Sequence, residues 1–206
     1  MSTASMAVER VLDLAQFCSG KGWLPATSGN LSAKIEQDPL LFAITRSGAD
    51  KQRLSEVDVL LVDRDMVVQN SQTFKPSAET TVHIALYEKL ACGSIVHVHT
   101  VFNNLISEIF GDAGYIRMSG HELLKALGHW EEGASIDLPI VENFHDLNQL
   151  GDAVREAARE GVPGVLVRNH GIYAWGDTAE TAKRHLEAFE FLFEYIFHLQ
   201  QYRNRA

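Results

Sequence analysis

The segment that decides the fold is Ser94-Ile95-Val96-His97-Val98-His99-Thr100. Its β-branched residues predict a strand. Because side chains alternate between the two faces of a strand, His97 and His99 point to one face, and Val96 and Val98 point to the other. Two imidazoles side by side on one face are a suitable pair of ligands for one divalent metal ion.

A third ligand would complete a catalytic zinc site with one position left open for substrate. The candidate is His170, which lies in the tight turn Arg168-Asn169-His170-Gly171 between two predicted strands. The alternative is a solvated polar strand face, since the chain has nine histidines and chance pairs are expected. Three further histidines lie in predicted helices without a partner at ligand spacing, and we predict core-edge or surface positions for them: His83, His185 and His198.

Three loops have the composition of an anion site. They are rich in hydroxyls and in small residues that leave backbone N–H groups accessible. The third loop also precedes a predicted helix, whose N-terminus favours negative charge. Each loop alone is typical of an ordinary turn, but together with the histidine strand they indicate a phosphate site. The loops are Thr27-Ser28-Gly29-Asn30, Thr45-Arg46-Ser47-Gly48 and Pro76-Ser77-Ala78-Glu79.

Periodicity and turn residues predict the other elements, which together form a three-layer α/β or α+β domain. No strand is followed by G-x-G-x-x-G, so a dinucleotide-binding fold has no support. Helices are predicted over 6–19, 78–90 with Ser77 as N-cap, 101–110, 121–127, 147–159, and from a capping box of Asp177 and Glu180 towards Tyr202. Strands are predicted over 31–35, 40–45, 59–62, 66–68, 94–99, 138–141, 165–168 and 172–175.

The composition of the 206 residues is that of a soluble globular protein, with 46% hydrophobic and 22% charged residues. No apolar run approaches the ~20 residues of a membrane span. The amino terminus does not resemble a signal peptide, and two distant cysteines, Cys18 and Cys92, do not suggest disulfides, so we expect a cytoplasmic protein. The net charge of -9 argues against nucleic acid or a membrane surface as partner. A bound phosphate must therefore be neutralised locally.

Five motifs in this order resemble the class II aldolase/adducin family, and the resemblance extends from the first predicted helix to the last. It implies that residues 1–206 form one class II aldolase-like domain, three layers α/β/α around a mostly antiparallel sheet. It also implies a homotetramer of fourfold symmetry that binds a small sugar phosphate in active sites at subunit interfaces. The motifs are Thr27–Asn30, Ile44–Gly48, Pro76–Glu79, His97–His99 and Arg168–Gly171.

Carried over to this chain, the resemblance assigns roles to individual residues. One Zn²⁺ per subunit would be bound by His97, His99 and His170. The phosphate would lie among five loop residues, with Asn30 near the carbonyl or hydroxyl oxygens of the substrate. Ala78 stands where the aldolases usually have a second serine, so one phosphate hydroxyl is missing. The five loop residues are Ser28, Gly29, Ser47, Gly48 and Ser77.

Two carboxylates distinguish the branches of the family. Glu79 matches the glutamate that is the general base of the aldolases. The stretch Met118–Lys125 resembles the dehydratases, in which a glutamate here, Glu122, is the acid/base. The aldolases instead contribute a tyrosine from this region, and no tyrosine lies between His121 and Trp130. The resemblance therefore favours a lyase that dehydrates a methylthio-substituted ribulose phosphate in methionine salvage, with Glu122 and Glu79 as its catalytic residues.

The alternatives remain open. Within enzymes the other candidate is a sugar-phosphate aldolase or 4-epimerase, and outside enzymes it is an adducin-like binding module that has lost the metal. Either glutamate could also be only a helix-start residue stabilised by the helix dipole. A methylthio group needs an apolar pocket, for which Phe102, Ile116 and Leu123 are candidates.

Overall fold

The computed structural model describes residues 2–203 and centres on one eight-stranded sheet. The strands are β1 (Asn30–Gln37), β2 (Leu40–Thr45), β3 (Val59–Asp63), β4 (Ser94–Val98), β5 (Tyr115–Ser119), β6 (Ser135–Val141), β7 (Gly164–Val167) and β8 (Gly171–Gly176). Their order is β3-β2-β1-β4-β8-β7-β6-β5, and only β6 and β7 pair in parallel. The predicted mostly antiparallel sheet is therefore confirmed.

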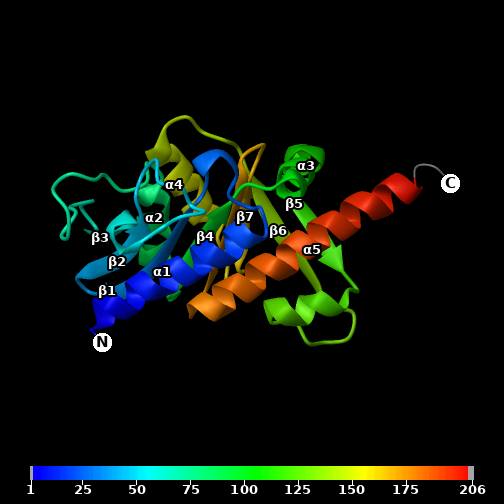
Figure 1. Cartoon of the computed structure of the whole chain (residues 1–206). Coiled ribbons are helices and arrows are strands. Elements are labelled where there is room, and N and C mark those ends of the chain that lie inside the picture. Colours follow the sequence, from blue (N-terminus) through cyan, green and yellow to red (C-terminus); the bar gives the residue numbers. More distant parts are fainter. Residues whose placement is uncertain (1, 204–206) are drawn as a thin grey trace.

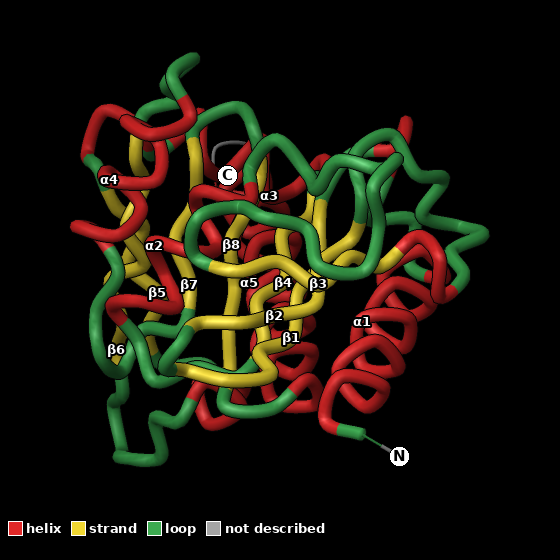
Figure 2. Tube along the Cα trace, turned by 90° about the vertical axis from the view of Figure 1, so that its left-hand side faces the viewer, coloured by secondary structure: helices red, strands yellow, loops and turns green. Residues whose placement is uncertain are grey.

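Helices cover both faces of this sheet, which confirms the three layers (Figures 1 and 2). Helices α1, α3 and α5 pack on one face, while α2 and α4 pack together on the other. Among residues 2–203, no helix has both the length and the apolar character to cross a bilayer. The helices are α1 (Thr3–Gly20), α2 (Thr80–Lys89), α3 (Val101–Ile109), α4 (Leu147–Ala157) and α5 (Ala179–Arg203), with short 3-10 turns η1 (Pro25–Thr27), η2 (Glu56–Asp58), η3 (Gly111–Ala113) and η4 (Glu122–Leu127).

The central strand β4 is buried along its whole length because helices cover both of its faces. Val96 and Val98 belong to the hydrophobic core beneath α1 and α5, whereas Ile95 belongs to the core beneath α2 and α4. By strand alternation, His97 lies on the same face as Ile95. The fold thus places this histidine between the sheet and the layer that contains α2, at the C-terminal end of β4.

The predicted strands differ from the observed ones at two places. The predicted strand 66–68 is absent, and only an isolated bridge joins Val68 to Val62. The reason is a tight turn in which Met66 has a left-handed φ of 63° and the side chain of Asp63 accepts a hydrogen bond from the N–H of Val67. Strand β5 was not predicted, although its alternating burial with Ile116 inside is typical of an amphipathic strand.

Three helix predictions also need correction. Helix α2 begins at Thr80, not Ala78, because the N–H of Ser77 is engaged by the carbonyl of Thr45 in an extended segment. Helix α5 begins at Ala179 and does not have the predicted capping box of Asp177. The hydroxyl of Thr178 instead accepts a hydrogen bond from the N–H of Thr181. The predicted helix 121–127 is the 3-10 turn η4, which ends at a glycine of positive φ. Cys18 and Cys92 are buried and free.

The core beneath α2 and α4 provides a test of the fold. Phe42 has 0% of its surface exposed and packs against Tyr87 with ring centroids 5.2 Å apart. We expect Phe42→Ala to lower the free energy of unfolding by about 3–5 kcal/mol, since it leaves a cavity in a packed core. Val57→Ala, at a position 67% exposed, is the control and should change the free energy of unfolding by less than about 0.5 kcal/mol. Urea denaturation at one protein concentration measures both, and equal losses would contradict the placement of Phe42.

Candidate metal centre

Three histidines that are distant in sequence meet at one end of the sheet. Strand β4 supplies His97, His99 directly follows it, and the turn between β7 and β8 supplies His170. Their potential ligand atoms all lie within 4.8 Å of one another. The ring centroids are 4.7–5.0 Å apart. In the described part of the chain, this is the one group of three or more such residues that could hold a metal ion.

The hydrogen bonds of the cluster leave nitrogen lone pairs pointing inward. The Nδ1–H of His97 donates to the carbonyl of Ile172 at 3.0 Å, so its Nε2 carries the free lone pair. This Nε2 lies 2.8 Å from the Nε2 of His99. The ligand nitrogens of a tetrahedral site with ~2.0–2.1 Å bonds lie ~3.3 Å apart, so these two nitrogens would separate slightly on binding an ion. The ring of His97 is held by stacking on Tyr173, with centroids 4.0 Å apart.

Burial keeps these imidazoles in their metal-binding form. It lowers the pKa of His97 to about 4 and the pKa of His99 to about 3, because a charged ring loses its hydration inside the protein. Both are therefore neutral at pH 7, and a neutral imidazole is the species that binds a metal. The Nδ1 of His170 is buried without a hydrogen-bond partner among the described residues. The donor set and its protonation fit a divalent ion that prefers imidazole.

The turn that carries His170 is fixed from both sides. Outside it, the guanidinium of Arg168 forms ion pairs with Glu108 at 2.9 Å and Asp112 at 2.8 Å. Inside it, the next residue must be glycine, because a Cβ on Gly171 would lie 2.4 Å from the carbonyl oxygen of Val98 and 2.8 Å from the ring of His99. The close approach of β8 to β4 therefore depends on this missing side chain.

Glu79 contacts two of the three histidines. Its Oε2 lies 3.2 Å from the Nε2 of His97, and its Oε1 lies 3.0 Å from the Nε2 of His170. The side-chain amide of Asn30 donates to Oε2 at 2.6 Å. Burial alone would raise the pKa of the Glu79 carboxyl. The positive charge that His97 carries when protonated, the hydrogen bond from His170 and the amide of Asn30 together hold this pKa well below its ordinary value. The predicted second carboxylate is thus an ionised group beside the cluster.

Glu122 is not brought to the histidines of its own chain. It lies at the start of η4 with 78% of its side chain exposed, and it pairs with Lys125 of the same turn at 2.9 Å. Among the described residues, no hydrogen bond or ion pair connects it to His97, His99 or His170.

The three predicted phosphate loops come together near the metal centre. The N–H of Ser77 donates to the carbonyl of Thr45, which joins the third loop to the second beside Ser47 and Gly48. The ammonium of Lys51 donates to the carbonyls of Thr27 and Ala49, which joins the second loop to the first.

The first loop has the features of an unfilled polar site. Its Ser28 hydroxyl is buried without a partner among the described residues, and a buried unsatisfied hydroxyl needs an explanation such as a ligand. Ala26 and Thr27 have left-handed φ values of 51° and 63°, a strain that clusters at functional sites. Gly29 is required, since a Cβ there would lie 2.6 Å from the carbonyl oxygen of His97.

Sequence reasoning missed several residues of this region. His83 is completely buried and hydrogen-bonds to Asn30 and Ser32, so the prediction of a core-edge or surface position was wrong. Its spacing of four residues from Glu79 on one helix was the pattern that could have found it. Lys51, 4% exposed, is a buried cation that contacts the first loop, and no motif marked it.

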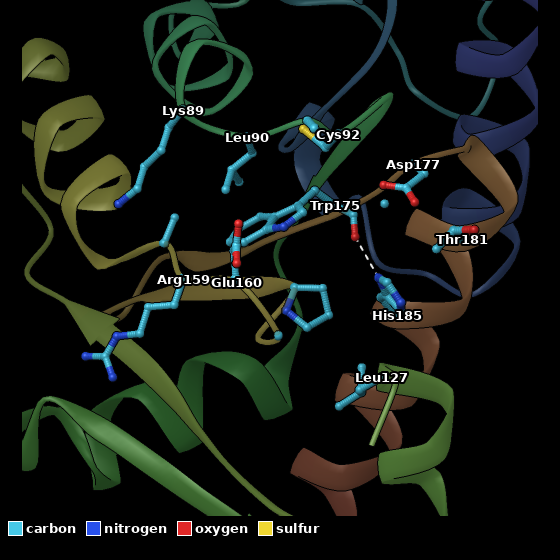
Figure 3. Close-up of a pocket in the computed structure, with 15 residues that line it drawn as sticks. Lys89, Leu90, Cys92, Leu127, Arg159, Glu160, Trp175, Asp177, Thr181 and His185 are labelled. Atoms are coloured by element: carbon cyan, nitrogen blue, oxygen red, sulfur yellow. Dashed lines mark hydrogen bonds between the residues drawn. The ribbon is translucent and has the colours of Figure 1, made fainter. Parts of the chain in front are cut away.

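A hollow of about 430 Å³ lies at the ends of β4 and β8 that are farther from the three histidines (Figure 3). Trp175, Cys92 and Leu90 line it, and the ring of His185 hydrogen-bonds to the carbonyl of Trp175 at 2.7 Å. It contains none of the predicted site residues. The three histidines that could hold a metal ion lie at the other end of these strands.

Comparison with known proteins identifies the class of protein. The model of the class II aldolase and adducin N-terminal domain family matches residues 9–197, and the chain belongs to this family. It is 48% identical to the methylthioribulose-1-phosphate dehydratase of Persephonella marina over 190 residues, 92% of this chain and 88% of that one. It is 49% identical to the enzyme of that name from Bacillus subtilis over 181 residues, 87% of each chain.

Solved structures show the same fold at lower identity. The L-fuculose-1-phosphate aldolase of Thermus thermophilus superimposes with a TM-score of 0.77 and 21% identity, covering 96% of this chain and 97% of that one. A sugar-phosphate aldolase of Thermotoga maritima gives a TM-score of 0.74 and 19% identity, covering 94% of each. At such identities the likeness concerns the fold alone.

Gly171 tests the geometry of the cluster. We expect Gly171→Ala to weaken Zn²⁺ binding by about 10-fold or more, because the added methyl group displaces the rings of His97 and His99. Competition with a chromophoric chelator measures the affinity. Gly20→Ala is the matched control, because a Cβ at that position meets nothing within 4 Å and should leave the affinity unchanged. Equal affinities of both variants would contradict the arrangement.

Proposed function

We propose that this chain is a methylthioribulose-1-phosphate dehydratase, a hydro-lyase of methionine salvage that uses one Zn²⁺ per subunit. The observation that carries the proposal is the identity of up to 49% with dehydratases of that name over most of the chain. The converging imidazoles of His97, His99 and His170 support the metal. They also disfavour the adducin-like alternative, because a binding module without catalysis has no need of them.

The metal has a defined part in this chemistry. When bound by the three imidazoles, Zn²⁺ acts as a Lewis acid on the oxygens of the ketose and has no redox chemistry of its own. The buried and neutral rings of His97 and His99 support this role. The chain's own residues must bind the phosphate, orient the sugar and move one proton.

The phosphate is proposed to lie among the three loops. Ser28, Ser47 and Ser77 offer hydroxyls, and Gly29 and Gly48 allow the backbone to turn its N–H groups towards an anion. The orphaned hydroxyl of Ser28 and the nearby ammonium of Lys51 support this position.

One carboxylate is proposed to transfer the proton. Glu122 takes the proton from C3 of the substrate and delivers it to the hydroxyl that leaves C4 as water, so a single proton is conserved through the elimination. Glu79 stays ionised between His97 and His170 and orients them. The enol product then tautomerises to the 2,3-diketone.

Glu122 would have to act on the metal site of a neighbouring subunit. Its side chain is exposed and pairs with Lys125, away from the histidines of its own chain. Helix α5 beside it presents exposed aromatic residues, Phe191 at 51% and Tyr195 at 45%, both next to the ring of His121. Its C-terminal end projects beyond the body of the molecule (Figure 1). We therefore propose a homotetramer whose interfaces complete the active sites.

An apolar groove beside His99 fits the methylthio tail. It measures about 560 Å³ and includes Trp23, Pro25, Phe102 and Val101, which is 71% exposed. Of the three residues predicted for this pocket, Phe102 lines the groove. Ile116 is wrong for the role, because it is completely buried in the core. Leu123 packs against the same core and does not line the groove.

A sugar-phosphate aldolase or 4-epimerase is the second candidate. The observation in its favour is that Glu79, the carboxylate matching the aldolase base, contacts the histidines within one chain, whereas Glu122 does not. An aldolase would release a carbonyl fragment from the substrate, and a dehydratase releases only water.

Substrate turnover decides between these two. Zinc-loaded protein with methylthioribulose 1-phosphate should give the absorbance of an enol or diketone and no dihydroxyacetone phosphate. Ribulose 1-phosphate, which lacks the apolar tail, should have a kcat/KM lower by about 10–200-fold, the discrimination that a small apolar group allows. Release of dihydroxyacetone phosphate, or no turnover of either compound, would reject the proposal.

Mixed oligomers test the origin of the acid/base. Glu122→Gln should keep its zinc and lose kcat by about 10²-fold or more, and His97→Ala should lose the metal. When the two inactive variants are dissociated together and reassembled, about a quarter of the sites should combine an intact metal centre with an intact Glu122 from a neighbour. Activity should then return to roughly that fraction of wild type. No recovery, in mixtures shown by mass spectrometry to contain both chains, would place Glu122 outside the neighbouring site.

A further inference from the structure

A buried chain of hydrogen bonds leads from the core to the carboxylate beside the histidines. The hydroxyl of Tyr87 lies 2.7 Å from the hydroxyl of Ser32, which lies 2.7 Å from the Nδ1 of His83. The Nε2 of His83 bonds to the Oδ1 of Asn30, whose Nδ2 donates to Glu79 at 2.6 Å. Tyr87, Ser32 and His83 are 0% exposed and Asn30 is 2% exposed, so water does not compete for these bonds.

The residue spacings of a helix and of a strand explain how these side chains align. His83 and Tyr87 are four residues apart in α2 and share one helix face, and Glu79, the N-cap of α2, precedes His83 by the same spacing. Asn30 and Ser32 are two residues apart in β1 and share one strand face. Side chains of the helix and of the strand alternate along the chain of hydrogen bonds. Among residues 2–203, no group outside this set hydrogen-bonds to the ring of His83.

The chemistry of the groups fixes the direction of every bond. The side-chain amide of Asn30 presents its Nδ2 to the carboxylate, so its Oδ1 faces His83 and must accept. His83 must then donate from Nε2. Burial lowers the pKa of His83 to about 3, so the ring is neutral and its Nδ1 has no hydrogen. Ser32 therefore donates to Nδ1, and Tyr87 donates to Ser32.

We propose that His83 is a positioning residue for the active site. Its Nε2–H selects one of the two orientations of the Asn30 amide, and that orientation directs an N–H, not a carbonyl oxygen, at Glu79. The reversed amide would place an oxygen against the carboxylate and release it from its position between His97 and His170. Ser32 and Tyr87 hold His83 in the tautomer that this selection needs. The consequence for catalysis rests on the proposed function, whereas the hydrogen-bond direction does not.

Neutron diffraction from deuterium-exchanged crystals of the zinc-loaded protein tests the direction without any assay. We expect a deuterium on the Nε2 of His83 and none on its Nδ1, and a deuterium on Tyr87 directed at Ser32. His97 in the same crystal is the internal comparison and should show the opposite tautomer, with deuterium on Nδ1 facing Ile172. A deuterium on the Nδ1 of His83 would overturn the proposal whatever the enzyme catalyses.

Substitutions test the consequence. His83→Phe should lower kcat by about 10–100-fold, the usual effect of losing an outer hydrogen-bond partner of a metal site. It should keep KM within about 2-fold, because His83 makes no hydrogen bond to the serines and glycines proposed to bind the phosphate. His83→Gln, which retains a donor and an acceptor, should recover most of the loss. His185→Gln, at a half-buried histidine that bonds to the carbonyl of Trp175, is the control and should keep wild-type kcat.

The outcomes separate positioning from folding. Wild-type kcat in His83→Phe, or an equal loss of kcat in His83→Phe and His83→Gln, would contradict positioning through the hydrogen bond. If His83→Phe does not fold, the comparison of His83→Gln with His185→Gln and the neutron structure still decide, because neither needs the phenylalanine variant.

Discussion

Three imidazoles lie with their ligand atoms within 4.8 Å of one another, and one carboxylate contacts two of them. This arrangement is the constraint on which the candidate site depends. Hydrogen-bonded pairing of β4 with β8 brings His97 opposite Tyr173 and carries the turn of His170 alongside. The arrangement also requires glycine at positions 171 and 29, where the backbone lies close to the strand of His97. A side chain at either position would collide with that strand. Helices on both faces exclude water, and burial keeps the rings neutral.

The negative charge of the protein makes local chemistry decisive. A chain with a net charge of -9 repels a phosphate at long range, so any attraction must come from groups within the site. The three loops provide hydroxyls and backbone turns, and the buried ammonium of Lys51 links two of them. The ammonium of Lys51, buried against the carbonyls of Thr27 and Ala49, would supply local positive charge to an anion bound among these loops.

The order of elements could be predicted from the sequence, and so could the three histidines that the structure brings together, because local patterns indicate them. The alternation of Val96, His97 and Val98 indicates which side chains share a strand face, and the turn at Arg168–Gly171 is visible from its composition. Element ends were less predictable, because partners elsewhere decide them. Helix α2 begins at Thr80 and not at Ala78, because the N–H of Ser77 is hydrogen-bonded to the carbonyl of Thr45. Met66 lies in a turn that the side chain of Asp63 stabilises, and not in the predicted strand.

The sequence by itself determined the fold class and the family and indicated the three histidines, because these depend on residue type and on spacing along one chain. Only the tertiary structure decided that His83 is buried against Asn30, that Lys51 joins the loops predicted to bind phosphate, and that Glu122 lies outside the histidine cluster of its own subunit. The physical reason is that a hydrogen bond depends on which side chains meet across elements. Asn30 and His83 are 53 residues apart, and nothing in their local sequence records that β1 and α2 bring them together.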